Sequence, residues 1–247
     1  MKQTSHNQRA RPECDADPQR ILSPINDWFQ HQGWSPLPFQ KRTWEAHLQG
    51  LSGLIQVPTG SGKTYAAVMG PIAQMLASAN EQAGIRLLYI TPLRALGRDL
   101  AVALQQPIDA MGWPLRVGIR NGDTPSAERS RQIKKPPEIL ITTPESLCVL
   151  LASRHCEALF KTLDTVVLDE WHELIGSKRG IQAELALSWL RQQRPQLQTW
   201  AISATIGNLE ESARHALGEG CEPCLITGAP KRGLDVTSIL PDSIDGF

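Results

Sequence analysis

The segment 57–64, with the sequence VPTGSGKT, constrains the fold of this chain more than any other feature. It follows a short apolar run, residues 54–57, and precedes a stretch of helix-forming residues. A glycine-rich turn between a strand and a helix aims backbone N–H groups and the positive end of the helix dipole at one point, where phosphate can bind. The segment therefore predicts an α/β fold with a phosphate-binding loop at the end of a strand.

The side chains of this loop fit a nucleoside triphosphate with magnesium. Lys63 offers a mobile positive charge to the phosphates, and Thr64 offers the hydroxyl that a phosphate-bound Mg²⁺ takes from such a loop. Val57 stands where the usual pattern has glycine or alanine, but Gly60 and Gly62 still permit the tight turn. The residues expected to bind the cofactor here are Thr59, Gly60, Ser61, Gly62, Lys63 and Thr64.

Length and charge limit the remaining possibilities. A chain of 247 residues can bury one large α/β core, and its 25 acidic residues balance its 25 basic ones. Affinity for nucleic acid must then come from a local patch. No apolar run approaches the length of a membrane span, and residues 1–20 lack an apolar signal segment, so a cytoplasmic location without a membrane partner is expected. The five scattered cysteines, Cys221 and Cys224 included, favour reduced thiols over a disulfide framework or a zinc site.

Short apolar runs alternate with helical stretches along the chain. Strands are predicted at residues 54–57, 85–90, 115–119, 139–141, 165–168, 199–202 and 224–226. Continuous apolar strands separated by helices favour a mostly parallel sheet with helices on both faces. We expect a flexible leader at 1–20, one domain at 21–228, and the start of a linker at 229–247.

Two helices have signals of their own. Residues 181–191 carry Ile181, Leu185 and Trp189 at helical spacing, which predicts a helix with these side chains on one face. Further on, Asn208 and Glu211 form a plausible capping pair for a helix that runs to Leu217.

Two carboxylates follow the apolar strand 165–168. We assign Asp169 to Mg²⁺, together with Thr64, and Glu170 to the water that attacks the phosphate. His172 is expected to sense the γ-phosphate. Two solvated acids at a strand end are the alternative, and the loop at 57–64 argues against it. The candidate catalytic residues are Lys63, Asp169, Glu170 and His172, and the candidate coupling residues are Ser203 and Thr205 of the next strand end.

Three further strand ends carry a Thr-Pro pair. Threonine is a good N-cap and proline suits the first helical turn, so each pair is predicted to open a helix whose N–H groups can hold nucleic-acid phosphates. Ordinary capping chemistry is the alternative. The candidate nucleic-acid residues are Thr91, Pro92, Arg94, Gly122, Asp123, Thr124, Thr143 and Pro144. Nearby charge is expected from Arg94, Arg98, Arg116, Arg120, Arg129 and Arg131.

Gln40 lies shortly before the phosphate loop. A glutamine amide can donate to and accept from the edge of adenine at once, which makes Gln40 a candidate cofactor-binding residue. A surface glutamine is the alternative, and the residues alone do not decide between the two.

Taken in order, these segments resemble the superfamily-2 DExH-box helicases. The resemblance rests on Gln40 and on residues 57–64, 91–96, 122–124, 143–145, 169–172 and 203–205, within 34–217. More narrowly, DEWHELIGSKRG at 169–180 and SATIGN at 203–208 are similar to the Lhr (large helicase-related) group of ligase-associated DEXH-box helicases. The resemblance implies a RecA-like P-loop NTPase domain that binds ATP and Mg²⁺, translocates on single-stranded DNA in the 3′-to-5′ direction, and serves DNA repair.

Such helicases close two RecA-like domains around ATP, and the second, with its arginine finger, has no counterpart in this sequence. We therefore expect the missing C-terminal helicase domains to act in cis, and weak ATP binding and poor hydrolysis by this chain alone. An RNA helicase and a catalytically incomplete, nucleotide-gated nucleic-acid-binding module are the alternatives. A small-molecule kinase is disfavoured because the residues 203–205 and the strand-end threonines would then have no role.

Overall fold

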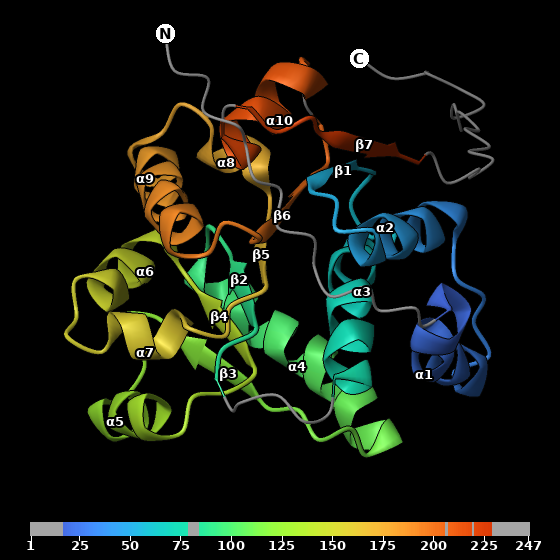
Figure 1. Cartoon of the computed structure of the whole chain (residues 1–247), viewed down its shortest axis with the longest axis horizontal. Helices are drawn as coiled ribbons and strands as arrows, with labels where there is room; N and C mark the ends of the chain where they lie inside the picture. The colour runs from blue at the N-terminus through green and yellow to red at the C-terminus, as the bar shows by residue number, and fades with distance from the viewer. Residues whose placement is uncertain (1–16, 79–83, 206, 219, 229–247) are drawn as a thin grey trace, which may run out of the picture.

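The computed structural model describes residues 17–78, 84–205, 207–218 and 220–228. Within them, the chain forms a seven-stranded sheet between two layers of helices (Figure 1). The strands are β1 (Gly53–Gln56), β2 (Leu87–Ile90), β3 (Val117–Arg120), β4 (Ile139–Thr142), β5 (Thr165–Leu168), β6 (Gln198–Ser203) and β7 (Cys224–Thr227). All seven predicted strands are confirmed, with boundaries shifted by at most two residues.

The sheet is parallel throughout, in the order β3-β4-β2-β5-β6-β1-β7. The helices of one layer are α1 (Pro18–His31), α2 (Pro38–Leu48), α3 (Lys63–Ala77) and α4 (Arg94–Met111). The other elements are α5 (Ser126–Lys134), α6 (Pro144–Leu151), α7 (Cys156–Phe160), α8 (Trp171–Leu174), α9 (Lys178–Gln193) and α10 (Leu209–Leu217).

Alternation along the strands fills both cores. In β2, Leu87 and Tyr89 pack on the side of α1–α4, and Leu88 and Ile90 pack on the side of α6–α10. Each of these side chains is fully buried, as expected for a parallel sheet covered on both faces. The predicted architecture, a RecA-like α/β fold, is confirmed.

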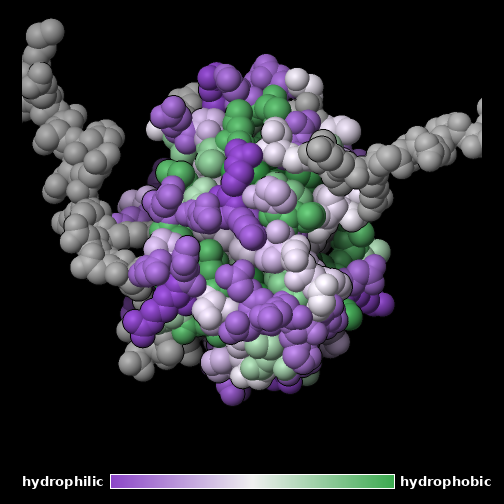
Figure 2. All heavy atoms as spheres, turned by 90° about the vertical axis from the view of Figure 1, so that its right-hand side faces the viewer, coloured by the Kyte–Doolittle hydropathy of each residue, from purple (hydrophilic) through white to green (hydrophobic). Residues whose placement is uncertain are grey.

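The N-terminal boundary differs from the prediction. Helix α1 begins at Pro18, with Asp17 as its N-cap, because the Asp17 carboxylate accepts from the backbone N–H of Gln19 at 3.0 Å. Residues 18–20 of the predicted leader are therefore helical, while residues 1–16 and the predicted linker 229–247 lie outside the described residues. Of the helices in the described part, none is long and apolar enough to cross a membrane. On the face that carries α1 and α2, apolar side chains are interspersed with hydrophilic ones (Figure 2).

Helix α9 turns a different face inward from the one predicted. Ile181 and Leu185 are exposed, at 56% and 67%, whereas Ala183 and Leu187 are fully buried. Ala183 and Leu187 belong to the apolar cluster on this side of the sheet, where α9 packs against α6. The capping prediction for α10 is confirmed: Asn208 Oδ1 accepts from Glu211 N at 3.2 Å, and Asn208 Nδ2 donates to Glu211 Oε2 at 2.9 Å.

Gly53 is a strict requirement of the sheet. It pairs with Trp200 on one side and Cys224 on the other, and a Cβ there would overlap the Cys224 carbonyl and lie 2.8 Å from the Trp200 ring. We expect Gly53→Ala to lower the free energy of unfolding by about 1–3 kcal/mol, because β7 must move outward. Chemical denaturation measures this. Gly207→Ala, where a Cβ meets no heavy atom within 4 Å, is the control; equal effects of the two would contradict the packing argument.

Candidate functional site

Three loops of the predicted site meet at the carboxyl edge of the sheet. β1 carries the phosphate loop, β5 carries Asp169 and Glu170, and β6, which lies between β1 and β5, carries Ser203. The strand order thus brings together segments that are more than a hundred residues apart, since Lys63 and Glu170 are separated by 107 positions.

The phosphate loop is a tight turn held by its own polar groups. Gly60 and Gly62 have φ angles of 73° and 87°, a backbone conformation that favours glycine. Ser61 Oγ donates to the Pro58 carbonyl at 2.6 Å, and Val57 N–H donates to Ser203 O at 3.2 Å. Val57 is buried beneath the turn, which explains why an apolar residue suits the position where glycine was expected.

Gln40 clamps the end of this turn. Its amide Nε2 donates to Gly62 O at 3.1 Å, and its Oε1 accepts from Leu37 N at 2.8 Å. The side chain is 3% exposed, so Gln40 is not a surface glutamine. A contact with adenine stays a prediction, and the amide retains a second N–H and a second lone pair for it.

Lys63 and Glu170 form an ion pair across the site. Lys63 Nζ lies 3.0 Å from Glu170 Oε1, and their side chains are 8% and 22% exposed. Burial of this degree is costly for two charges unless they are paired. Lys63, which is predicted to bind the phosphates, and Glu170, which is predicted to act on the attacking water, therefore hold each other in place.

The carboxylate loop has an unusual backbone. Glu170 has φ 42°, the one positive φ at a non-glycine position among the described residues. Asp169 N–H donates to Ile90 O at 2.8 Å, and Asp169 Oδ1 accepts from Glu170 N at 2.9 Å. This left-handed turn separates the two carboxylates and lets Glu170 reach Lys63. Strained conformations of this kind concentrate at functional sites.

His172 joins the carboxylate loop to the end of β6. Its Nδ1 lies 3.1 Å from Ser203 Oγ and 3.4 Å from Glu170 Oε2. Ser203 Oγ donates to the Thr205 carbonyl at 3.4 Å, which leaves it as an acceptor for a proton on Nδ1. Ser203 is fully buried and Thr205 is exposed. Of the two predicted coupling residues, Ser203 therefore contacts His172, and Thr205 contacts Ser203 through its carbonyl.

Thr64 and Asp169, the two residues predicted to hold Mg²⁺, have a neighbour in common. Both lie beside the hydroxyl of Tyr89, a residue of β2 that the sequence analysis did not single out. Burial, and then the neighbouring charge of Glu170, raises the pKa of Asp169 to about 6. Burial makes the negative charge of this oxygen cluster costly. Such a cluster suits a hard divalent cation such as Mg²⁺, because the cation offsets that charge. Side chains at alternate positions of β2 face the same layer of helices, so the sequence could have placed Tyr89 on the same face of the strand as Leu87.

The predicted nucleic-acid residues follow β2, β3 and β4, which are neighbours at the other end of the same carboxyl edge. Only one Thr-Pro pair caps a helix: Thr143 Oγ1 accepts from Ser146 N at 3.4 Å, with Pro144 as the first residue of α6. The helix-capping predictions for Thr91 and Thr124 are wrong, because α4 is capped at Leu93 and α5 at Pro125, without side-chain bonds. A contact of these residues with nucleic acid stays a prediction.

These threonines serve turns. Thr91 Oγ1 donates to Leu93 O at 3.4 Å, and Thr124 Oγ1 donates to Ile119 O at 3.2 Å. The threonines and Pro92 and Pro144 are buried, whereas Arg94, Gly122 and Asp123 are exposed. Arg94 pairs with Asp123 at 3.1 Å, so it links two of the loops that end at this edge.

Most of the arginines expected here have protein partners. Arg129 donates to the carbonyls of Thr124, Asn121 and Gly122, at 2.7, 3.2 and 2.9 Å, and so shapes the loop between them. Arg120 donates to Arg129 O at 3.0 Å. Arg131 pairs with Glu128 on the same helix. Arg116 lies at the amino end of β3, where it pairs with Glu138, so its predicted place beside the nucleic-acid residues is wrong.

One ion pair connects the two halves of the site. Arg179 at the start of α9 binds Glu145 in the first turn of α6, and the second contact of this pair measures 3.3 Å. The segment that follows the carboxylates is thereby tied to the Thr143-Pro144 loop.

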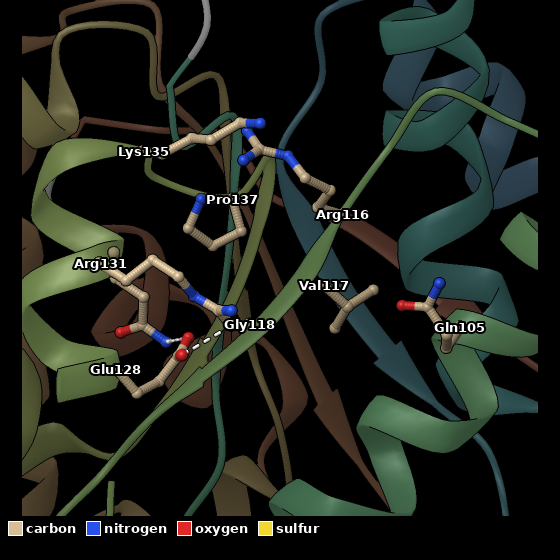
Figure 3. A pocket seen from close by; sticks show the side chains of 9 residues that line it. Gln105, Arg116, Val117, Gly118, Glu128, Arg131, Lys135 and Pro137 are labelled. Atoms are coloured by element: carbon tan, nitrogen blue, oxygen red, sulfur yellow. Dashed lines mark hydrogen bonds and ion pairs between the residues drawn. The ribbon is translucent and has the colours of Figure 1, made fainter. Parts of the chain in front are cut away.

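A basic cavity of about 380 Å³ lies elsewhere. Figure 3 shows it over the start of β3, between Gln105 of α4 and the Glu128–Arg131 pair of α5, with Arg116 and Lys135 at its rim. Because these residues lie at the amino end of β3, the cavity faces away from the phosphate loop.

Comparisons with known proteins agree with this geometry. Residues 37–212 match the family model for the DEAD/DEAH box helicases. The Lhr helicase/uracil glycosylase of Escherichia coli (strain K12) is 37% identical over 231 residues, which cover 85% of this chain and 15% of that protein. The ATP-dependent helicase Lhr-Core of Methanothermobacter thermautotrophicus is 34% identical and covers 90% of this chain and 28% of its own length.

A solved structure is also similar. The Mycobacterium smegmatis helicase Lhr bound to ssDNA and AMP-PNP superposes with a TM-score of 0.78 at 34% identity, over 87% of this chain and 29% of that one. The chain thus spans between about one seventh and three tenths of the length of these relatives.

The raised pKa of Asp169 has a consequence for stability. Because this pKa is about 6 in the folded chain and 3.8 is the ordinary value, the folded state binds more protons between these values. Stability should fall as pH rises from about 4 to about 6 and stay reduced above that. Asp169→Asn keeps the acceptor for Glu170 N–H and removes the charge. We expect it to raise the free energy of unfolding at pH 7 by up to about 3 kcal/mol.

Denaturant unfolding at pH 4 and pH 7, without added metal, measures the difference. The exposed Asp99→Asn is the matched control. A gain at pH 7 that equals the gain at pH 4 would contradict the assignment of the cost to the Asp169 charge.

Proposed function

This chain belongs to the DEAD/DEAH box helicase family, and we propose that it is the first motor domain of an ATP-dependent DNA helicase or translocase. The observation that carries the proposal is the meeting of Lys63 and Glu170 at 3.0 Å. It joins the phosphate loop and the carboxylate loop at one edge of the sheet, beside the loops after β2, β3 and β4. The edge thus has a place for a triphosphate at one end and for a strand at the other.

ATP with Mg²⁺ is the proposed cofactor. The turn around Gly60 and Gly62, followed by the N-terminus of α3, suits the phosphates. Thr64 and Asp169 would hold Mg²⁺, and the ion would neutralise part of the phosphate charge. Lys63 must leave Glu170 to bind the phosphates. The freed Glu170 carboxylate can then accept a proton from a water molecule, and His172 transmits the change to Ser203.

Single-stranded DNA is the proposed substrate. The structural relative is described as bound to ssDNA and AMP-PNP, which supports DNA over RNA. The exposed Arg94 could contact a phosphate if it exchanged its partner Asp123 for one, and a phosphate contact distinguishes DNA from RNA only where a 2′-hydroxyl is also read. We extend the proposal to a DNA-repair setting, implied by the resemblance to the Lhr group, and to a cytoplasmic location.

The motor is proposed to be completed in cis. The relatives are several times longer than the part that this chain matches, which supports further domains. An arginine finger from a second RecA-like domain contributes on the order of 10³–10⁵ in rate in related phosphoryl transfer. Without it, the charge that develops in the transition state is only partly neutralised.

Lys63→Ala tests the nucleotide site. We expect it to weaken binding of a fluorescent ATP analogue by about ten-fold or more, because a charge-assisted bond to phosphate is lost. Lys135→Ala, at the rim of the distant basic cavity, is the control and should bind as the natural chain does. If Lys135→Ala weakened binding and Lys63→Ala did not, the nucleotide would lie in that cavity and the proposal would be wrong.

A second test concerns turnover. We expect purified 1–247 to hydrolyse ATP slowly, with little stimulation by single-stranded DNA, and a chain extended by the missing domains to restore stimulated turnover. Phosphate release measures both. Robust DNA-stimulated turnover by 1–247 alone would show that no second domain is needed.

The extended chain also separates DNA from RNA. Strand displacement on DNA and RNA forks of matched sequence is expected to favour DNA. A catalytically incomplete, nucleotide-gated nucleic-acid-binding module is the second candidate. It is favoured by the contacts of Arg129 and of the Arg94–Asp123 pair, which shape the loops at this edge and need no hydrolysis to do so. The test is the DNA affinity of Lys63→Ala. If this variant loses ATP binding but binds DNA as tightly as the natural chain, the result supports the module over a coupled motor.

A further inference from the structure

Tyr89 lies in an inner strand of the sheet. It lies in β2, where it pairs with Ile141 of β4 and Val167 of β5, and its side chain is fully buried on the side of α3. The neighbouring strand positions on this face are purely apolar, so a phenol is not needed to fill the core.

The hydroxyl of Tyr89 is aimed at the carboxyl edge. It makes no hydrogen bond of ordinary geometry, although it is completely buried. Its neighbours are the Asp169 carboxylate and the Thr64 hydroxyl. A buried hydroxyl without a partner costs about 1–3 kcal/mol, which is out of place in a core that could hold phenylalanine.

The chemistry of the three groups is complementary. The ordinary pKa of a phenol is about 10, so at neutral pH the Tyr89 hydroxyl carries its proton and can donate it. One oxygen of Asp169 already accepts from Glu170 N–H at 2.9 Å. The Tyr89 hydroxyl can donate to the carboxylate and accept from Thr64, which gives both groups a fixed orientation.

We propose that Tyr89 is a positioning residue for magnesium: its buried hydroxyl orients the Asp169 carboxylate and the Thr64 hydroxyl toward a shared cation. The inference rests on the proposed function, since it concerns the same nucleotide site. Partners in the outer shell of a metal site orient the ligands, and their loss typically costs 10–100-fold in metal affinity.

Tyr89→Phe is the test, because it removes one oxygen and keeps the ring. At a fixed concentration of a fluorescent ATP analogue, magnesium is titrated and the concentration for half-maximal binding is recorded. We expect Tyr89→Phe to raise this concentration by about ten-fold, with binding in excess EDTA unchanged. Its melting temperature without magnesium should be equal to or above that of the natural chain, because an unpartnered buried hydroxyl is gone.

Tyr65→Phe is the matched control. It removes the same atom from the residue after Thr64, but the Tyr65 hydroxyl donates to Ala103 O at 3.4 Å, on α4. Its magnesium midpoint should equal that of the natural chain. A positioning role predicts that Tyr89→Phe weakens magnesium affinity without lowering the melting temperature. Tyr65→Phe should leave the magnesium affinity unchanged.

Two results would overturn the inference. One is an unchanged magnesium midpoint in Tyr89→Phe. The other is a fall in melting temperature together with weaker binding in EDTA, which a purely structural role produces. Asp169→Asn and Lys63→Ala are measured in parallel: if these two also bind the nucleotide with the natural magnesium dependence, the proposed nucleotide site itself is wrong. If they lose it and Tyr89→Phe does not, only the role of Tyr89 fails.

Discussion

The ion pair between Lys63 and Glu170 is the constraint on which the site depends. It brings a lysine from the first residue of α3 to a glutamate that follows β5, and the largely buried charges must stay together or be satisfied by something equally polar. A triphosphate is such a partner for Lys63. The positive φ of Glu170 is part of the same arrangement, since it turns this carboxylate toward Lys63 and leaves Asp169 beside Thr64 and Tyr89. Binding and release of nucleotide can therefore change the partner of one carboxylate without moving the other.

The order of the strands connects a change of partner at Glu170 to the other loops at this edge of the sheet. β6 lies between β1 and β5, so Ser203 is within reach of His172, whose ring also faces Glu170. On the other side, Arg179 ties the segment after the carboxylates to Glu145 and the Thr143-Pro144 loop. A rigid parallel sheet fixes the spacing of all these loops, and only side chains at its carboxyl edge need to change partners.

Sequence patterns predicted the sheet and the chemical groups well because both have strong local signals. Fully buried parallel strands are continuous apolar runs, and the phosphate loop and the carboxylate pair are short motifs with fixed spacing. The errors concern choices that tertiary contacts make. Thr91 and Thr124 have the chemistry of helix caps, but their hydroxyls bond to nearby carbonyls in turns. Helix α9 buries Ala183 and Leu187 instead of Ile181 and Leu185, because its packing against α6 and the sheet decides which side faces inward. The role of Tyr89 depends on two residues distant in sequence, so no local pattern could assign it.

The internal bonding of the arginines has a consequence for the thermodynamics of nucleic-acid association. A phosphate contact made by an arginine releases condensed counterions and makes affinity fall steeply with salt. At this edge, Arg129 and Arg120 are engaged by backbone carbonyls and Arg94 by Asp123, while Arg131, paired with Glu128, and Arg116 line the cavity at the opposite edge. Few counterions are then displaced by this surface. A strand held here through the neutral N–H and hydroxyl donors of the loops would bind with an affinity that depends little on ionic strength.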